Sequence, residues 1–158
     1  MLYKTHLLFS ILISIFITSF IYIKSKYLFI LILLLSTFIP DIDHPDSKIG
    51  KKFRFSSYVL NKLFSHRGFF HSLIFPILIY FIFSYIFELK EIALAVSLGI
   101  SSHLFLDLLT KEGLSLFAPF SNKRIHGFIK TGSILEKILF IILLFSFFIL
   151  TYKHLLNP

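Results

Sequence analysis

The sequence contains no cysteine. This absence excludes disulfides, thiolate metal sites, iron–sulfur clusters and cysteine nucleophiles. A metal ion bound to this chain must therefore take its ligands from histidine, aspartate, glutamate or backbone oxygen atoms.

Charged residues are also scarce, at 15% of 158 residues, while 56% of the chain is hydrophobic. Soluble domains have about 25% charged and about 45–50% apolar residues. The composition and the mean hydropathy of +0.87 exclude a disordered chain and favour a protein dissolved in the lipid bilayer. The length is typical of one domain, so we expect residues 1–158 to form a single membrane-embedded helical domain.

Long apolar runs predict the helices, at residues 7–23, 27–39, 73–87, 92–109 and 134–151. A transmembrane helix needs about 20 apolar residues, so whether the short second and third runs cross fully stays open. The first run exceeds the roughly 7–15 apolar residues of a signal peptide and lacks a small-residue cleavage site. We therefore expect a retained helix there. The prediction is an all-α, polytopic membrane protein with about five transmembrane helices and polar loops at 40–72 and 110–133.

The basic residues predict the orientation. If all five runs cross, twelve of the 16 lysine and arginine residues lie on the side of the N-terminus and four lie opposite. Because basic residues favour the cytoplasmic side, we expect the N-terminus in the cytoplasm and the C-terminus outside. The formal net charge of +8 is then explained by contact with anionic membrane lipids. We expect no nucleic-acid partner, and the sequence predicts no oligomeric state.

Histidine and acidic residues gather at the helix ends that this topology places on the cytoplasmic side. They are His6, Asp41, Asp43, His44, His66, His71, His103, Asp107 and Glu136. Ionisable residues in or beside membrane helices are costly, so they are functional candidates. Imidazole and carboxylate together suit zinc, iron or manganese, and the sequence predicts a divalent metal site at this end.

Spacing suggests individual roles. His103 and Asp107 are four residues apart and share one helix face, so both can bind one ion. Asp41 and Asp43 alternate in what we expect to be extended chain, so one is a ligand and the other a general base or a supporting partner. Glu136 has two open readings: a metal-binding or catalytic role, or a capping box with Ser133 three residues before it.

Four segments in this order resemble the YdjM-like family of predicted membrane-bound, metal-dependent hydrolases. They are Asp41-Ile42-Asp43-His44-Pro45, His66-Arg67-Gly68-Phe69-Phe70-His71-Ser72, Ser102-His103-Leu104-Phe105-Leu106-Asp107 and Thr131-Gly132-Ser133, preceded by His6-Leu7-Leu8. A more distant similarity is to the zinc-dependent phospholipase C and P1 nuclease group, whose His-x-x-x-Asp pairs resemble His103 and Asp107. Glu136 departs from that pattern, because Gly132 stands where a second histidine would be. One or two ions, expected to be zinc, are therefore the safer prediction.

The leading hypothesis is a metal-dependent hydrolase that cleaves a phosphoester, including a lipid phosphoester, at the inner leaflet. We expect His71, His103, Asp107 and one of Asp41 and Asp43 to bind the ion, with His66 or His6 available for a second. The remaining aspartate or Glu136 is the expected base, and Arg67 the expected phosphate clamp. Two alternatives stay open: a transporter or metal-permeation protein, and a non-enzymatic protein with a structural metal.

Overall fold

The computed structural model describes residues 1–43, 58 and 68–156, with only the backbone at Asp43 and 153–156. Its α-helices are α1 (Tyr3–Phe20), α2 (Lys26–Ser36), α5 (Ile74–Phe81), α6 (Lys90–Leu108) and α7 (Ile134–Leu156). Short 3₁₀ turns, η1 (Pro40–Asp43) and η2 (Phe69–His71), and a π-helical turn, η3 (Ile82–Ile86), complete the order. The described part contains isolated β-bridges but no strand, which confirms the all-α prediction.

Three helices are long and apolar enough to cross a membrane: Tyr3–Phe20, Lys90–Leu108 and Ile134–Tyr152. The helix α2 has 11 residues, and Ile74–Ile86 is a shorter apolar helix. At a rise of about 1.5 Å per residue, α2 covers about 16 Å of a hydrocarbon core that is about 30 Å thick. Five full crossings thus stay a prediction.

The helix α2 is shorter than the apolar run that predicts it. The helix predicted over 27–39 ends at Ser36, because Pro40 disfavours helical backbone just before it and starts the turn η1. The sequence spacing of Phe55, Val59 and Leu63 also predicts a short amphipathic helix within 53–65. Apart from the exposed Tyr58, that segment lies outside the described residues.

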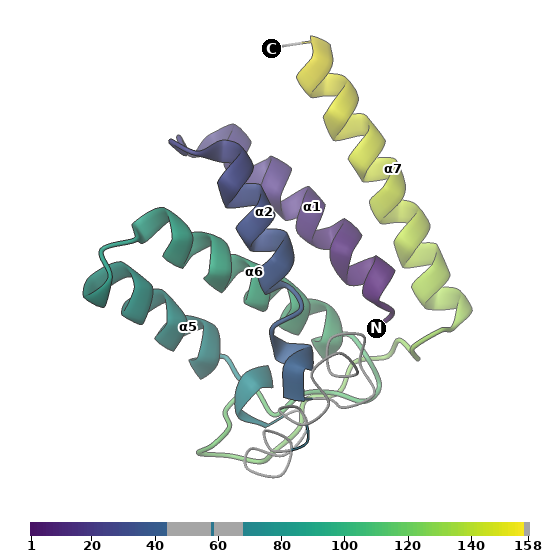
Figure 1. The fold of residues 1–158 in the computed structure, drawn as a ribbon. Helices are drawn as coiled ribbons and strands as arrows, with labels where there is room; N and C mark the ends of the chain where they lie inside the picture. The colour runs from purple at the N-terminus through teal and green to yellow at the C-terminus, as the bar shows by residue number, and fades with distance from the viewer. Residues whose placement is uncertain (44–57, 59–67, 157–158) are drawn as a thin grey trace.

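The helices form a bundle around α6 and α1 (Figure 1). Both α2 and α5 pack against α6, while α1 packs against α2, α6 and α7. In this arrangement α1 and α7 begin, and α2 and α6 end, at the same end of the bundle. We call it the site end, because the histidine and aspartate candidates of these helices lie there.

The contact between α2 and α6 depends on a glycine. A Cβ atom at Gly99 would lie 2.4 Å from the backbone oxygen of Leu33 and 2.9 Å from Cβ of Ser36. Only a residue without a side chain lets the two backbones approach so closely. Beside this contact, the hydroxyl of Thr37 donates to Ser10, which in turn shares a hydrogen bond of 2.8 Å with Ser102. These bonds tie α1, α2 and α6 together beneath the site end.

The segment 110–133 folds back onto the end of α6. The Gly127 N–H donates to the carbonyl of Thr110 at 2.8 Å, and the Ile129 N–H donates to that of Leu109 at 3.0 Å. Gly127 is required there, since a Cβ atom would lie 2.2 Å from the Leu109 backbone. The loop is therefore an ordered cover over the site end.

Candidate metal centre

The helix α6 supplies the two central side chains. His103 and Asp107 are separated by one helical turn and point the same way, as their spacing predicts. The Nε2 atom of His103 lies 3.6 Å from Oδ2 of Asp107, and the side chains are 1% and 5% exposed. A buried carboxylate requires a positively charged or hydrogen-bonding partner, so Asp107 needs such a partner here.

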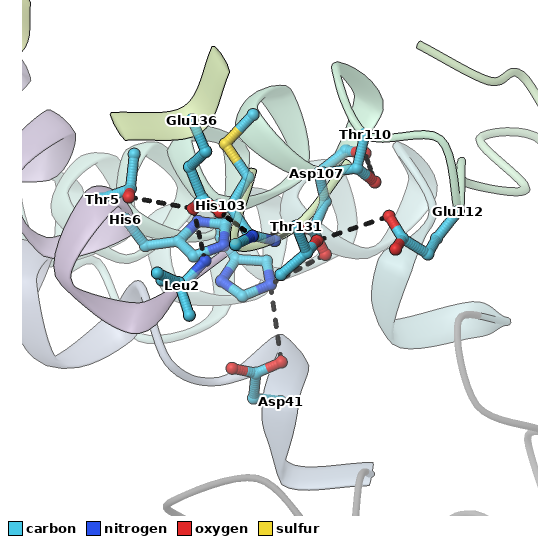
Figure 2. Close-up of polar contacts among 12 residues, drawn as sticks. Leu2, Thr5, His6, Asp41, His103, Asp107, Thr110, Glu112, Thr131 and Glu136 are labelled. Atoms are coloured by element: carbon cyan, nitrogen blue, oxygen red, sulfur yellow. Dashed lines mark hydrogen bonds and ion pairs between the residues drawn. The ribbon is translucent and has the colours of Figure 1, made fainter. Parts of the chain in front are cut away.

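The first turn of α1 adds His6 (Figure 2). Its ring stacks on that of His103 with centroids 4.1 Å apart and planes inclined by 10°. Its Nε2 atom lies 3.3 Å from Oδ1 of Asp107. The α-amino group of Met1 forms an ion pair of 2.6 Å with the same oxygen. Asp107 thus meets groups from both α6 and the start of α1.

The turns η1 and η2 bring in Asp41 and His71. Oδ1 of Asp41 lies 3.6 Å from Nε2 of His103, and the His71 and His103 ring centroids are 5.5 Å apart. The structure therefore places Asp41 in the cluster, whereas only the backbone of Asp43 is described. The expectation of extended chain here was wrong: Pro40–Asp43 is a 3₁₀ turn, because Pro40 fixes φ near the helical value.

These side chains form two overlapping ligand sets. His6, His103 and Asp107 form one set, and Asp41, His71 and His103 form the other, each with ligand atoms within 4.8 Å of one another. His103 belongs to both. The five residues were all predicted as metal ligands from the sequence, and the structure brings all five together; their binding of an ion stays a prediction.

The surroundings of the buried His103 nitrogens show whether these residues suit a metal ion. Among the described residues, neither ring nitrogen has a hydrogen-bond partner. The separations of 3.6 Å from two carboxylates are too long for hydrogen bonds. They match the roughly 3–4 Å between ligand atoms that each lie about 2.0–2.1 Å from one ion. A donor set of imidazole and carboxylate suits zinc and its neighbours, so these residues fit a divalent metal.

Glu136 has a different environment, although it lies at the same end. One carboxylate oxygen accepts hydrogen bonds from the Leu2 N–H at 2.6 Å and the Thr5 hydroxyl at 3.0 Å. The other accepts from the Gly132 N–H at 2.6 Å. The capping-box reading was wrong, because the carboxylate bonds Gly132 rather than Ser133, whose buried hydroxyl has no partner among the described residues. Glu136 ties the start of α1 to the start of α7.

Three candidate residues, His44, His66 and Arg67, lie outside the described residues. Thr5 contacts Glu136 at this end without belonging to any of the sequence motifs above. Its signal was present: a hydroxyl residue directly before His6, at the start of a helix with the apolar composition of a membrane span.

A family model described as "YdjM inner membrane protein" matches residues 1–156. The chain belongs to this family. The chain is 42% identical over 101 residues to the protein YvsG of Bacillus subtilis (strain 168), a match that covers 63% of each chain. It is 35% identical over 91 residues to the inner membrane protein YdjM of Escherichia coli (strain K12), covering 54% of this chain and 46% of that protein. No solved structure matches.

The matches span less than two thirds of the length of these curated relatives. Together with three membrane-length apolar helices, membership of the YdjM family places the protein in the inner membrane. The names of the relatives give no reaction, so the chemistry has to be argued from the side chains of the site.

Proposed function

We propose that this member of the YdjM family is a membrane-bound, metal-dependent hydrolase that cleaves a phosphoester at the inner leaflet. The observation that carries the proposal is Nε2 of His103, which is buried, lacks a hydrogen-bond partner among the described residues and lies 3.6 Å from each of two carboxylates. Burying a polar nitrogen without a partner costs free energy. A divalent cation would serve as the partner of this nitrogen and of both carboxylates.

We assign His103, Asp107, Asp41 and His71 as the residues that would hold the ion, expected to be zinc, with His6 available for a second. A divalent ion held there supplies a bound water of lowered pKa and polarises a phosphoryl oxygen. The resemblance to metal-dependent hydrolases, including the distant one to phospholipase C and P1 nuclease, stays a prediction alongside this assignment.

Exposure gives the direction of approach. The Asp41 side chain is 30% exposed, whereas those of His103 and Asp107 are 1% and 5% exposed. Substrate and water therefore reach the centre past Asp41. Asp43, in the same 3₁₀ turn, is the proposed general base that takes the proton of the attacking water. Arg67 is the proposed clamp on the substrate phosphate, because a guanidinium matches phosphate oxygens in pairs.

The position of the ionisable residues supports a hydrolase over a transporter. Among the described residues of α1 and α6, those residues lie only near helix ends, with Lys4 and His6 at one end of α1 and Lys90 and Glu91 opposite His103 and Asp107 on α6. A path for ions would need polar groups across the whole depth. The hydroxyls of Ser10, Thr37 and Ser102 instead bond one another.

The test starts with elemental analysis of protein purified in detergent without added metal. It continues with hydrolysis assays on phosphodiester, phosphomonoester and phospholipid substrates. We expect a stoichiometric divalent metal and metal-dependent hydrolysis of at least one substrate, both lost in His103→Ala. The matched control is Ser14→Ala, which lies about two turns along α1 from His6. Among the described residues, its buried hydroxyl bonds only the carbonyl of Ile11. Retained metal without hydrolysis would favour a structural metal, and no metal in the wild type would end the proposal.

A further inference from the structure

The segment 113–130 exposes aromatic side chains outside the membrane-length helices. Phe117, Phe120 and Phe128 are 55%, 88% and 66% exposed. Their positions in the chain lie between the end of α6 and the start of α7, in the loop that runs along the site end of the bundle (Figure 1). Large apolar side chains that are exposed outside the membrane-length helices require an apolar partner.

Basic residues accompany these rings. Lys123, Arg124 and Lys130 are exposed, and residues 113–133 contain no aspartate or glutamate. Aromatic rings with lysine and arginine are typical of segments that lie in the interface of an anionic membrane. We call Phe117, Phe120, Phe128, Lys123, Arg124 and Lys130 the loop surface.

The fold holds the loop surface in place. The segment is part of the loop 110–133, which starts two residues after the end of α6 at Leu108 and is followed directly by Ile134, the first residue of α7. The N–H of Leu114 donates to Ile125 at 3.0 Å, and the Ile125 N–H donates back at 2.9 Å. The Leu73 N–H donates to Leu116 at 3.0 Å, which attaches the loop to the start of α5. The loop that carries these rings therefore connects two membrane-length helices at their site end.

We propose that the loop surface binds the anionic phospholipid leaflet at the site end, with its phenylalanine rings at the boundary of headgroups and acyl chains. The lysine and arginine side chains then lie among lipid phosphates, where each basic residue is attracted by the negative surface potential. Single-stranded nucleic acid also selects rings and basic residues. The attachment of the loop to α6 and α7 favours lipid, since those helices bring the surface to a bilayer.

The consequence concerns depth. The loop is bonded to the end of α6, which carries His103 and Asp107, through Gly127 and Ile129. Insertion of the loop surface would therefore set the candidate metal centre near the level of the lipid headgroups. This inference is independent of hydrolysis, since it concerns the position of a surface and is tested without turnover.

The chain contains no tryptophan, so Phe120→Trp introduces a single fluorophore. We would reconstitute this variant of the full chain into vesicles of phosphatidylcholine with phosphatidylglycerol, and separately into phosphatidylcholine alone. In the anionic vesicles we expect blue-shifted emission, strong quenching by lipids brominated on the acyl chain, and several-fold weaker quenching by iodide than for free N-acetyltryptophanamide. Phe128→Trp gives an independent reading, and Phe145→Trp on the exposed flank of α7 is the control that brominated lipid quenches in both vesicle types.

The charge requirement is tested in the same background by Lys123→Gln, Arg124→Gln and Lys130→Gln together. We expect these changes to reduce bromolipid quenching of the Phe120→Trp variant in anionic vesicles and to leave the Phe145→Trp control unchanged. Iodide quenching equal to that of N-acetyltryptophanamide, with none by brominated lipid, would overturn the proposal. So would equal quenching in both vesicle types, or an emission change with a single-stranded oligonucleotide and none with lipid.

Discussion

The carboxylate of Glu136 accepts a hydrogen bond of 2.6 Å from the backbone N–H of Leu2, although 134 residues separate the two in sequence. The first N–H groups of a helix lack partners within the helix, and α1 has no side-chain cap of its own at Leu2. Glu136 therefore caps the N-terminus of α1 from another helix. Its negative charge also interacts favourably with the positive end of the α1 dipole. Because His6 is in the first turns of α1, this bond helps to position a predicted metal ligand.

We predict that Glu136→Gln destabilises the protein. The amide replaces an acceptor oxygen by a donor that faces N–H groups, so a buried group loses its partner at a cost of about 1–3 kcal/mol. Thermal unfolding in detergent measures the effect. The control is Glu91→Gln, because Glu91 also accepts from a backbone N–H, that of Lys24, but at an exposed position where changes stay within about 0.5 kcal/mol. Unchanged stability with lost hydrolysis would instead identify Glu136 as the general base.

Asp107→Asn is predicted to weaken metal binding while the helix survives. Asparagine keeps the shape of the side chain but removes the charge that the cluster offers to a cation. We expect the affinity for zinc to fall at least about tenfold, since even partners of metal ligands contribute about 10–100-fold. Calorimetric titration with zinc measures this, and Ser14→Ala serves again as the control. Full zinc affinity in Asp107→Asn would make Asp107 a structural partner of His103 and His6.

Labelling of single cysteines tests the orientation, because the natural chain has none. Lys111→Cys lies at the site end and Tyr22→Cys follows the opposite end of α1, and both positions are exposed. From the charge distribution, we expect a membrane-impermeant maleimide to label Tyr22→Cys in intact cells. Lys111→Cys should react only after permeabilisation. The reverse pattern would place the metal centre outside the cytoplasm, and its substrate with it.

Gly99→Ala is predicted to separate α2 from α6. The added methyl group meets the backbone oxygen of Leu33, which cannot rotate away as a flexible side chain can. Overpacking of this kind costs about 1–3 kcal/mol, and it should lower the unfolding temperature measurably. Ser101→Ala on the same helix, at a half-buried position, is the control. A wild-type unfolding temperature in Gly99→Ala would show that the contact is looser than described.

The sequence by itself determined the class of protein and the central pair of the site. Composition decides where a chain is soluble, because the free energy of transfer adds up over residues regardless of their order. Helical periodicity is local, so two residues four apart, His103 and Asp107, share a face in any helix. The gathering of His6, Asp41 and His71 at the same end also followed, because successive helices alternate in direction.

Tertiary structure alone decided the particular partners. The 3₁₀ turn after α2 places Asp41 at His103. Glu136 became a tether because α1 packs against α7, which brings Leu2 and Thr5 to its carboxylate. The fold-back of 110–133 depends on the approach of Gly127 to Leu109. Such contacts join residues far apart in the chain. They depend on how several helices pack together, so the pattern of neighbouring residues in the sequence does not predict them.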